Sequence, residues 1–256
     1  LVPVWMAIPL VVIVVAAILI VYFVKTGMTK SNQYEVPNLI GTSYQDAIAE
    51  VIASRVGKLL HIPVVQYQLC RIRVDDEKLL IGTISHNFCH KNESFISFET
   101  MVESSDEPIQ WAVSAKENYA LVIDLFRTLT GLDARDYLNT MLLFDFLICN
   151  EDRHLNNFGV LKDETDGSYR FPPLFDSGYA LGFMQAEHRP VEQYLYSCKA
   201  KPFSTSFSKQ LHLVNQLPSG IVLPDSIPDT VFDGLPLSAQ MLDYCSTILQ
   251  IRLQQL

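Results

Sequence analysis

Asp152, Asn157 and Asp176 are the residues whose types and spacing could do chemistry. Asp152 and Asn157 lie five residues apart in the polar segment CNEDRHLNNFGVL, and Asp176 follows in FDSG. In phosphoryl transfer, one Asp orients or accepts the proton of a hydroxyl, while an Asn and a second Asp hold magnesium. The Asn amide oxygen is a hard ligand that adds no charge. The three residues therefore predict magnesium-dependent transfer of a phosphoryl group from a nucleotide.

Each of these residues also has a simpler interpretation. Asp152 could merely cap or solvate a loop, and Asn157 could close an Asx turn, with its neighbour Asn156 as a rival for the metal. Asp176 could be an ordinary turn residue. We favour the chemical interpretation because the residues occur together at the separations that the reaction needs.

The elements on either side of these residues predict how they are positioned. An apolar helical pattern over 134–149, which Asp133 could cap, ends where the polar segment begins, so the loop starts from a rigid support. An apolar run, an Asp-Gly turn at 166–167 and a second run predict a hairpin over 158–174. This hairpin would carry Asp176 back beside Asp152, although the two residues are well separated in the sequence.

Arg153 and His154 are interpreted as structural residues. Asp145 is a carboxylate within the apolar pattern of the preceding helix. A buried carboxylate needs a partner. We expect Arg153 or His154 to tie the loop to Asp145 or to neighbouring backbone.

The preceding part of the chain predicts a mixture of helices and strands. A helix that Thr42 or Ser43 could cap runs to Pro63 and carries Glu50; its apolar residues are Ile48, Val51, Ile52, Val56 and Leu59. Two apolar runs separated by DDEK predict a hairpin over 64–85. Another helix is predicted over 117–131. The pattern indicates an α+β fold.

Composition excludes some classes of function. The chain has 256 residues, of which 49% are hydrophobic and 18% charged. This is enough for one large domain or two lobes. Its net charge of −9 argues against a direct nucleic-acid partner, which would need a surplus of Lys and Arg. Its five cysteines are widely spaced and form no CxxC pair. These features predict reduced thiols and a cytoplasmic catalytic domain.

Residues 1–24 include no charged side chain, and Lys25 and Lys30 follow them. A run of this length suffices for a membrane-spanning helix of roughly 20 residues, which would anchor the domain through residues 4–24. The run is also rich in Val and Ile, so its later part could form strands. Both interpretations stay open.

The segments NEDRHLNNFGVL and PPLFDSGYALGF resemble the C-terminal catalytic domain of HipA-like serine/threonine kinases, a family that includes CtkA-like proteins. In this resemblance Arg and His follow the catalytic Asp, whereas the ordinary kinase loop H-R-D-x-x-x-x-N places them before it. The segments YQDAIAEVIASRVGKLLHIPVVQYQL and CKAKPFSTSFSKQLHLV extend the resemblance, which covers roughly residues 22–214.

The resemblance implies a bilobal protein-kinase-like fold with a small, truncated N-lobe (25–113) and a mainly helical catalytic C-lobe (114–256). It implies Asp152 as catalytic base, Asn157 and Asp176 as magnesium ligands, and Glu50 as the helix partner of the nucleotide-binding Lys25. The cofactors would be ATP and Mg²⁺, and the partners a protein substrate and an antitoxin-like protein.

One departure from the family keeps two alternatives open. Before Gly27 the sequence has no glycine, so no Gly-rich loop that covers phosphates precedes Lys25. The chain could therefore be a membrane-attached pseudokinase that binds a nucleotide or a partner. It could also be a phosphoinositide-type lipid kinase, because such enzymes share an Asp-Arg-His-x-x-Asn loop, although no basic cluster lies near the loop to hold an anionic headgroup.

Overall fold

The structure is a computed structural model that describes residues 44–73, 79–104, 111–185 and 189–256. Lys25, the apolar segment 1–24 and the predicted cap at Thr42 or Ser43 lie outside these ranges. Within them, no helix has both the length and the apolar character that crossing a membrane requires.

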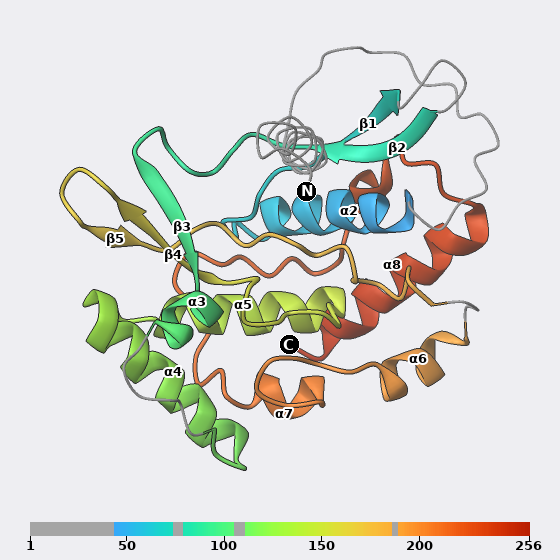
Figure 1. The fold of residues 1–256 in the computed structure, drawn as a ribbon. Helices are drawn as coiled ribbons and strands as arrows, with labels where there is room; N and C mark the ends of the chain where they lie inside the picture. Colours follow the sequence, from blue (N-terminus) through green and yellow to red (C-terminus); the bar gives the residue numbers. More distant parts are fainter. Residues whose placement is uncertain (1–43, 74–78, 105–110, 186–188) are drawn as a thin grey trace, which may run out of the picture.

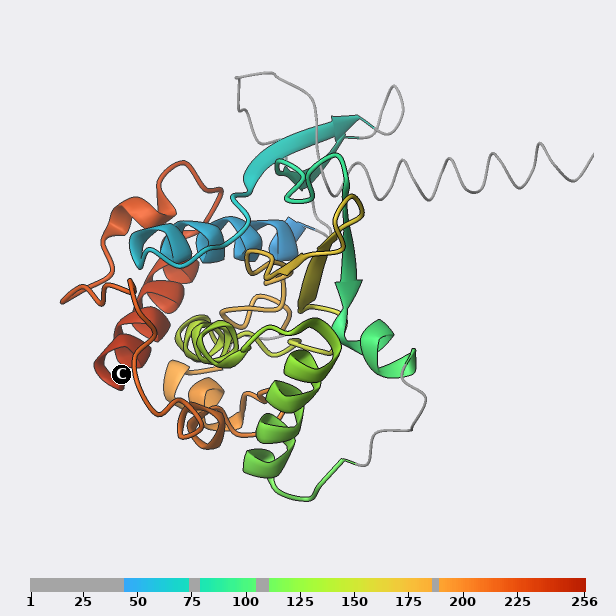
Figure 2. The ribbon, with the colours of Figure 1, turned by 90° about the vertical axis from the view of Figure 1, so that its left-hand side faces the viewer.

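Helix α5 (Arg135–Ile148) lies at the centre of the molecule. Figure 1 shows α2 (Gln45–Leu59) on one side of it and α7 (Phe207–Leu211) on the other. In the view turned by 90°, α5 is seen end-on, with α4 (Ala115–Thr130) and α8 (Ala239–Gln254) on different sides (Figure 2). Every residue of α5 from Leu138 to Ile148 is buried except Thr140.

The strands form two small antiparallel sheets. Strands β1 (Gln68–Arg73) and β2 (Leu79–Ile84) make a hairpin above α2 in Figure 1. Strands β3 (Glu93–Ser97), β4 (Gly159–Asp163) and β5 (Tyr169–Arg170) make a sheet of order β3-β4-β5. Because β3 pairs with β4, the chain that precedes α4 and α5 lies beside the chain that follows these two helices.

Short helical elements complete the described chain. Helix α3 directly follows β3, with Ser97 as its N-cap, and the other short elements lie towards the C-terminus. Their bounds are α3 (Phe98–Glu103), α6 (Val191–Ser197) and the 3₁₀ helix η2 (Asp229–Phe232). One continuous buried apolar cluster extends from Ile48 in α2 to Leu253 in α8, so these elements share a core.

The predicted elements agree well with the structure. The helix that carries Glu50, the hairpin over 64–85, the two helices around 117–149 and the hairpin over 158–174 are all present. Tyr44 is the N-cap residue of α2, and its side chain makes no capping bond. Asp133 accepts a hydrogen bond from the Arg135 main-chain N–H at 3.1 Å, although Ala134 is the N-cap residue of α5. The described chain combines helices with two small antiparallel sheets, in agreement with the α+β class that the sequence predicts.

Candidate active site

The polar loop begins where α5 ends. Cys149 has a left-handed backbone (φ 50°) that terminates the helix and turns the chain into the loop. The next residue, Asn150, is fully buried: its side-chain Nδ2 donates to Asp145 Oδ1 at 3.0 Å, and its side-chain Oδ1 accepts from the Asp152 main-chain N–H at 3.3 Å. The loop is therefore fixed to the helix before it reaches Asp152.

Arg153 joins this loop to the segment that carries Asp176. Its guanidinium contacts Asp145 at 2.8 Å and 2.9 Å, and both side chains are fully buried. It also donates to the carbonyl oxygens of Asn157 (3.1 Å) and Phe175 (2.6 Å). The interpretation of Arg153 as a structural residue tied to Asp145 is confirmed. His154 lies at the surface, where its Nδ1 accepts a hydrogen bond from the Asn156 main-chain N–H at 3.3 Å and its Nε2 lies 4.0 Å from the carboxylate of Asp152.

Asn157 contacts both of the residues that carry the predicted carboxylates. Its side-chain amide donates to Asp176 Oδ2 at 2.9 Å and to the main-chain oxygen of Asp152 at 3.4 Å. Asn157 is 2% exposed, so its orientation is fixed by packing. The hairpin β4–β5 brings Asp176 back to the loop, as its turn residues predict.

Asn156, the rival for the metal role, is held elsewhere. Its side-chain Oδ1 accepts from Ser97 Oγ at 2.8 Å, and its side-chain Nδ2 donates to the Glu99 carboxylate at the start of α3. Of the two neighbouring asparagines, Asn157 is therefore the one that lies beside Asp176.

Glu50 reaches the same site from α2. The segment after α2 pairs with the segment before Asp176, through a bridge between Val64 and Leu174 whose hydrogen bonds are 2.8 Å long. As a result, the Ser177 main-chain N–H donates to the Glu50 carboxylate. Burial, followed by the charge of Asp176, raises the pKa of Glu50 to about 8. A carboxylate in this environment favours a proton or a nearby cation.

The carboxylate of Asp152 is paired with Lys201, a residue that the sequence analysis missed. Lys201 Nζ lies 2.6 Å from Asp152 Oδ1, and both side chains are partly exposed. The loop that carries Lys201 is braced by Gln210 of α7, which is 1% exposed and donates to the Lys201 carbonyl oxygen at 2.9 Å. The segment CKAKPFSTSF was noted for its resemblance to the family, but its spacing of 49 residues from Asp152 gives no sign of this contact.

The residues present fit a magnesium–nucleotide complex. Asp176 offers carboxylate oxygens and Asn157 an amide oxygen, and the negative charge of Asp176, which contributes to the raised pKa of Glu50, favours a cation nearby. Within the described ranges, no cluster of three or more His, Cys, Asp or Glu side chains could hold a metal alone. Magnesium commonly takes one or two protein carboxylates and completes its shell with water and phosphate oxygens, so this sparse set suits it.

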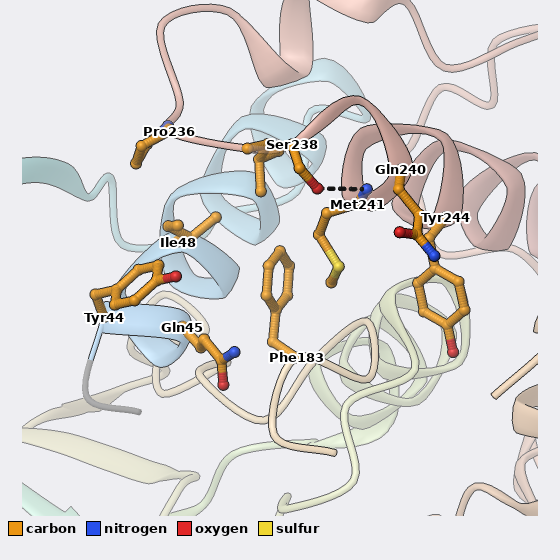
Figure 3. Close-up of a pocket in the computed structure, with 10 residues that line it drawn as sticks. Tyr44, Gln45, Ile48, Phe183, Pro236, Ser238, Gln240, Met241 and Tyr244 are labelled. Carbon is orange, nitrogen blue, oxygen red and sulfur yellow. Dashed lines mark hydrogen bonds between the residues drawn. The ribbon is translucent and has the colours of Figure 1, made fainter. Parts of the chain in front are cut away.

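A separate cavity lies between the starts of α2 and α8. It has a volume of about 200 Å³, and its walls include Tyr44, Ile48, Phe183 and Met241. In Figure 3 the side chains of Phe183 and Met241 lie side by side, and Ser238 Oγ accepts the Met241 N–H as the cap of α8. None of the predicted site residues lines this cavity, so it is not the site of the proposed chemistry.

The sequence matches no protein family, and it matches no curated protein. Among solved structures, the fold is similar to that of the Helicobacter pylori proinflammatory kinase CtkA, with a TM-score of 0.60. The two chains are 16% identical, and the similarity covers 83% of this chain and 84% of CtkA.

A second solved structure is HipA of Shewanella oneidensis MR-1, in a toxin–antitoxin complex with HipB and its operator DNA. The TM-score is 0.41 at 14% identity; the match covers 82% of this chain and spans about half of HipA, 55%. Because this TM-score is low, we draw no conclusion about the fold from the similarity to HipA. The comparison with CtkA shows that the fold of the described chain is similar to that of CtkA.

Proposed function

We propose that this chain is an ATP- and magnesium-dependent kinase that phosphorylates Ser or Thr hydroxyls of a protein substrate. The observation that carries the proposal is that Asn157 contacts both the side chain of Asp176 and the main chain of Asp152, in a loop braced by the buried Arg153. The similarity of the fold to that of a kinase supports it.

In the proposed phosphoryl transfer, each of these side chains has a separate role. The Asp152 side chain is 33% exposed, so an acceptor hydroxyl can approach it and give up its proton there. Asn157 and Asp176 would hold magnesium, which when bound neutralises charge on the nucleotide phosphates. Lys201 places a positive charge beside Asp152, where the transferred group would pass. Glu50 would pair with Lys25, which lies outside the described residues.

The first test replaces the proposed base. We expect Asp152→Asn to lower transfer from labelled ATP by about 10²–10⁴, because it removes the proton acceptor but keeps the shape. Asp124→Asn, which changes an exposed carboxylate on α4, is the matched control and should leave the rate unchanged. Full activity in the Asp152 variant would contradict the assignment of the base.

The same assay distinguishes the alternative functions. Protein and phosphoinositide acceptors are offered in parallel with magnesium and labelled ATP, and calorimetry measures nucleotide binding. Label on lipid would indicate a lipid kinase, and binding without transfer would indicate a pseudokinase. Asp176→Asn should weaken magnesium-dependent ATP binding more than Asn157→Ala, since Asp176 carries charge. Unchanged affinity in the Asp176 variant would exclude its metal role.

The partner of the kinase also stays a proposal. The sequence resemblance implies an antitoxin-like protein in addition to the protein substrate. The net charge of −9 argues against direct binding of nucleic acid by this chain. Co-purification of the full chain with a candidate antitoxin would test this partner.

A further inference from the structure

Two cysteines beside the candidate site share one arginine. Cys149 follows the last residue of α5, Cys198 follows the last residue of α6, and Arg252 belongs to α8. We propose that Cys149 and Cys198 form an oxidisable dithiol site, in which Arg252 stabilises a thiolate and hydrogen peroxide converts the pair into a disulfide. This inference does not depend on the proposed function.

The contacts place both sulfur atoms on the same guanidinium. Arg252 Nε lies 3.2 Å from Cys149 Sγ, and Nη2 lies 3.4 Å from Cys198 Sγ. Cys149 is fully buried, whereas Cys198 is 8% exposed and Arg252 is 4% exposed. The cluster is therefore enclosed, with slight access to solvent at Cys198.

The buried charge of Arg252 favours an anion nearby. A guanidinium stays protonated in proteins, and a buried charge without a counter-charge is costly. The other recorded contacts of Arg252 are neutral: Gln255 Oε1 at 3.2 Å and the rings of Phe146 and Phe207 at 4.4 Å and 5.3 Å. By contrast, the buried Arg153 pairs with the carboxylate of Asp145. In the described chain, the groups that touch Arg252 and can become anionic are the two thiols.

The two sulfur atoms have different environments. Interaction with Cys149, together with the charge of Arg252, lowers the pKa of Cys198. Burial raises the pKa of Cys149. Cys198, which also has the slight solvent access, is therefore the thiolate that attacks peroxide, and Cys149 is the thiol that closes the disulfide.

The reaction balances as two steps. The Cys198 thiolate attacks one peroxide oxygen, the O–O bond breaks, and a sulfenic acid and hydroxide form. The Cys149 sulfur then displaces the hydroxyl group from the sulfenic acid, giving the disulfide and water. Together, one thiolate, one thiol and H₂O₂ give a disulfide, water and hydroxide, and each sulfur gives up one electron to the peroxide.

The position of the dithiol connects it to the candidate site. Cys149 precedes Asp152 by three positions, and Cys198 precedes Lys201 by three. Between these segments, Glu151 accepts hydrogen bonds from the Lys199 N–H at 2.7 Å and from the Tyr194 hydroxyl at 3.3 Å. Oxidation removes the thiolate that pairs with Arg252, so the packing around both segments must change. We expect the Asp152–Lys201 pair to be displaced and transfer to slow, an effect that rests on the proposed function.

The test oxidises the full chain with hydrogen peroxide and maps its thiols by mass spectrometry. We expect a cross-linked peptide that contains Cys149 and Cys198 and disappears with dithiothreitol. Burial raises the pKa of the more exposed Cys70 and Cys89. Because the pKa of Cys198 is lowered instead, Cys198 should be oxidised before these two. Oxidation of Cys70 and Cys89 before Cys198, with no cross-link between Cys149 and Cys198, would overturn the proposal.

Two variants provide controls. Cys198→Ser should form no cross-link, whereas Cys245→Ser should form it as the unmodified chain does. Cys245 is also fully buried, but within the described residues no arginine hydrogen-bonds to it, and burial raises its pKa to about 12. The measurement on the unmodified chain stands even if Cys198→Ser fails to fold. An unchanged cross-link rate in chains with Arg252→Gln that fold would exclude the role of the guanidinium.

Transfer assays before and after peroxide separate the two proposals. If the disulfide forms and slows transfer reversibly, both are supported. If the disulfide forms and no state transfers phosphate, the dithiol site stands and the proposed function fails. If the disulfide forms and transfer continues unchanged, the predicted effect on the Asp152–Lys201 pair is wrong.

Discussion

At the scale of single residues, Lys201 is the basic side chain that pairs with the proposed base. It lies 2.6 Å from Asp152, and it would lie beside the phosphoryl group as charge develops. We expect Lys201→Met to lower kcat by about 10², the magnitude typical of one lost electrostatic contact in a transition state, and to leave KM for ATP unchanged. Steady-state kinetics with varied ATP would measure both constants.

The neighbouring Lys199 supplies the control for that prediction. It is also exposed, and its recorded contact is through the main-chain N–H to Glu151, which survives side-chain replacement. Lys199→Met should therefore behave like the unmodified chain. Equal losses in the two variants would show that general positive charge, and not the contact with Asp152, matters.

Glu50 predicts a dependence of stability on pH. Its pKa is raised from 4.5 to about 8 in the fold, so the folded chain binds the proton more tightly than the unfolded chain. The contribution of Glu50 to the free energy of unfolding should therefore fall as the pH rises from 4.5 to about 8. Gln resembles the protonated acid, so Glu50→Gln should remove this decline. Thermal unfolding across that range, without nucleotide, measures it.

An exposed glutamate gives the comparison for Glu50. Glu192 lies in the first turn of α6, and Glu192→Gln should keep the pH dependence of the unmodified chain. If Glu50→Gln also keeps this pH dependence, Glu50 does not cause the decline in stability. That result is expected if a cation already neutralises Glu50 in the fold. That result would support the pairing with Lys25 that the resemblance implies.

At the scale of elements, the β3–β4 pairing holds the start of the hairpin close to β3. A Cβ added at Gly159 would overlap the Ile96 carbonyl oxygen and lie 2.8 Å from the Ser97 Cα. Both neighbours are backbone atoms of β3 and cannot rotate away. We expect Gly159→Ala to destabilise the fold by about 3 kcal/mol, at the upper end of ordinary overpacking, and urea unfolding would measure the loss.

The control for Gly159 lies in the same strand. Lys162 forms an exposed ion pair with Glu164. Such a pair is worth less than about 1 kcal/mol, so Lys162→Ala should cost little. Similar losses for both variants would mean that β3 moves to accept the added methyl group. Since Asn157 lies just before β4, Gly159→Ala should also weaken nucleotide binding.

At the scale of the whole molecule, the core crosses the boundary predicted between the lobes at residues 113 and 114. The buried cluster joins α2 to α8, and β3 pairs with β4 across the same boundary. We expect the described part of the chain to unfold in one cooperative transition, with equal calorimetric and van't Hoff enthalpies. Two separate transitions in scanning calorimetry would instead indicate lobes that are stable independently.

The sequence by itself determined the local structure and much of the candidate site. Apolar periodicity predicted α2, α4 and α5, and turn residues predicted both hairpins, because these signals depend on neighbouring residues. The hairpin over 158–174 then placed Asp176 beside Asn157. Asp145 predicted a polar partner, because a carboxylate within an apolar helix needs one. Arg153 is that partner.

Only the tertiary structure decided which distant side chains meet. Lys201 reaches Asp152 across 49 residues, and Arg252 reaches Cys149 across 103. Glu50 reaches the Asp176 segment because the chain after α2 pairs with Leu174. No spacing in the sequence encodes these contacts, since they depend on how α2, α6, α7 and α8 pack around α5. The local pattern fixes the side chains available, and the shared core decides which of them lie within bonding distance.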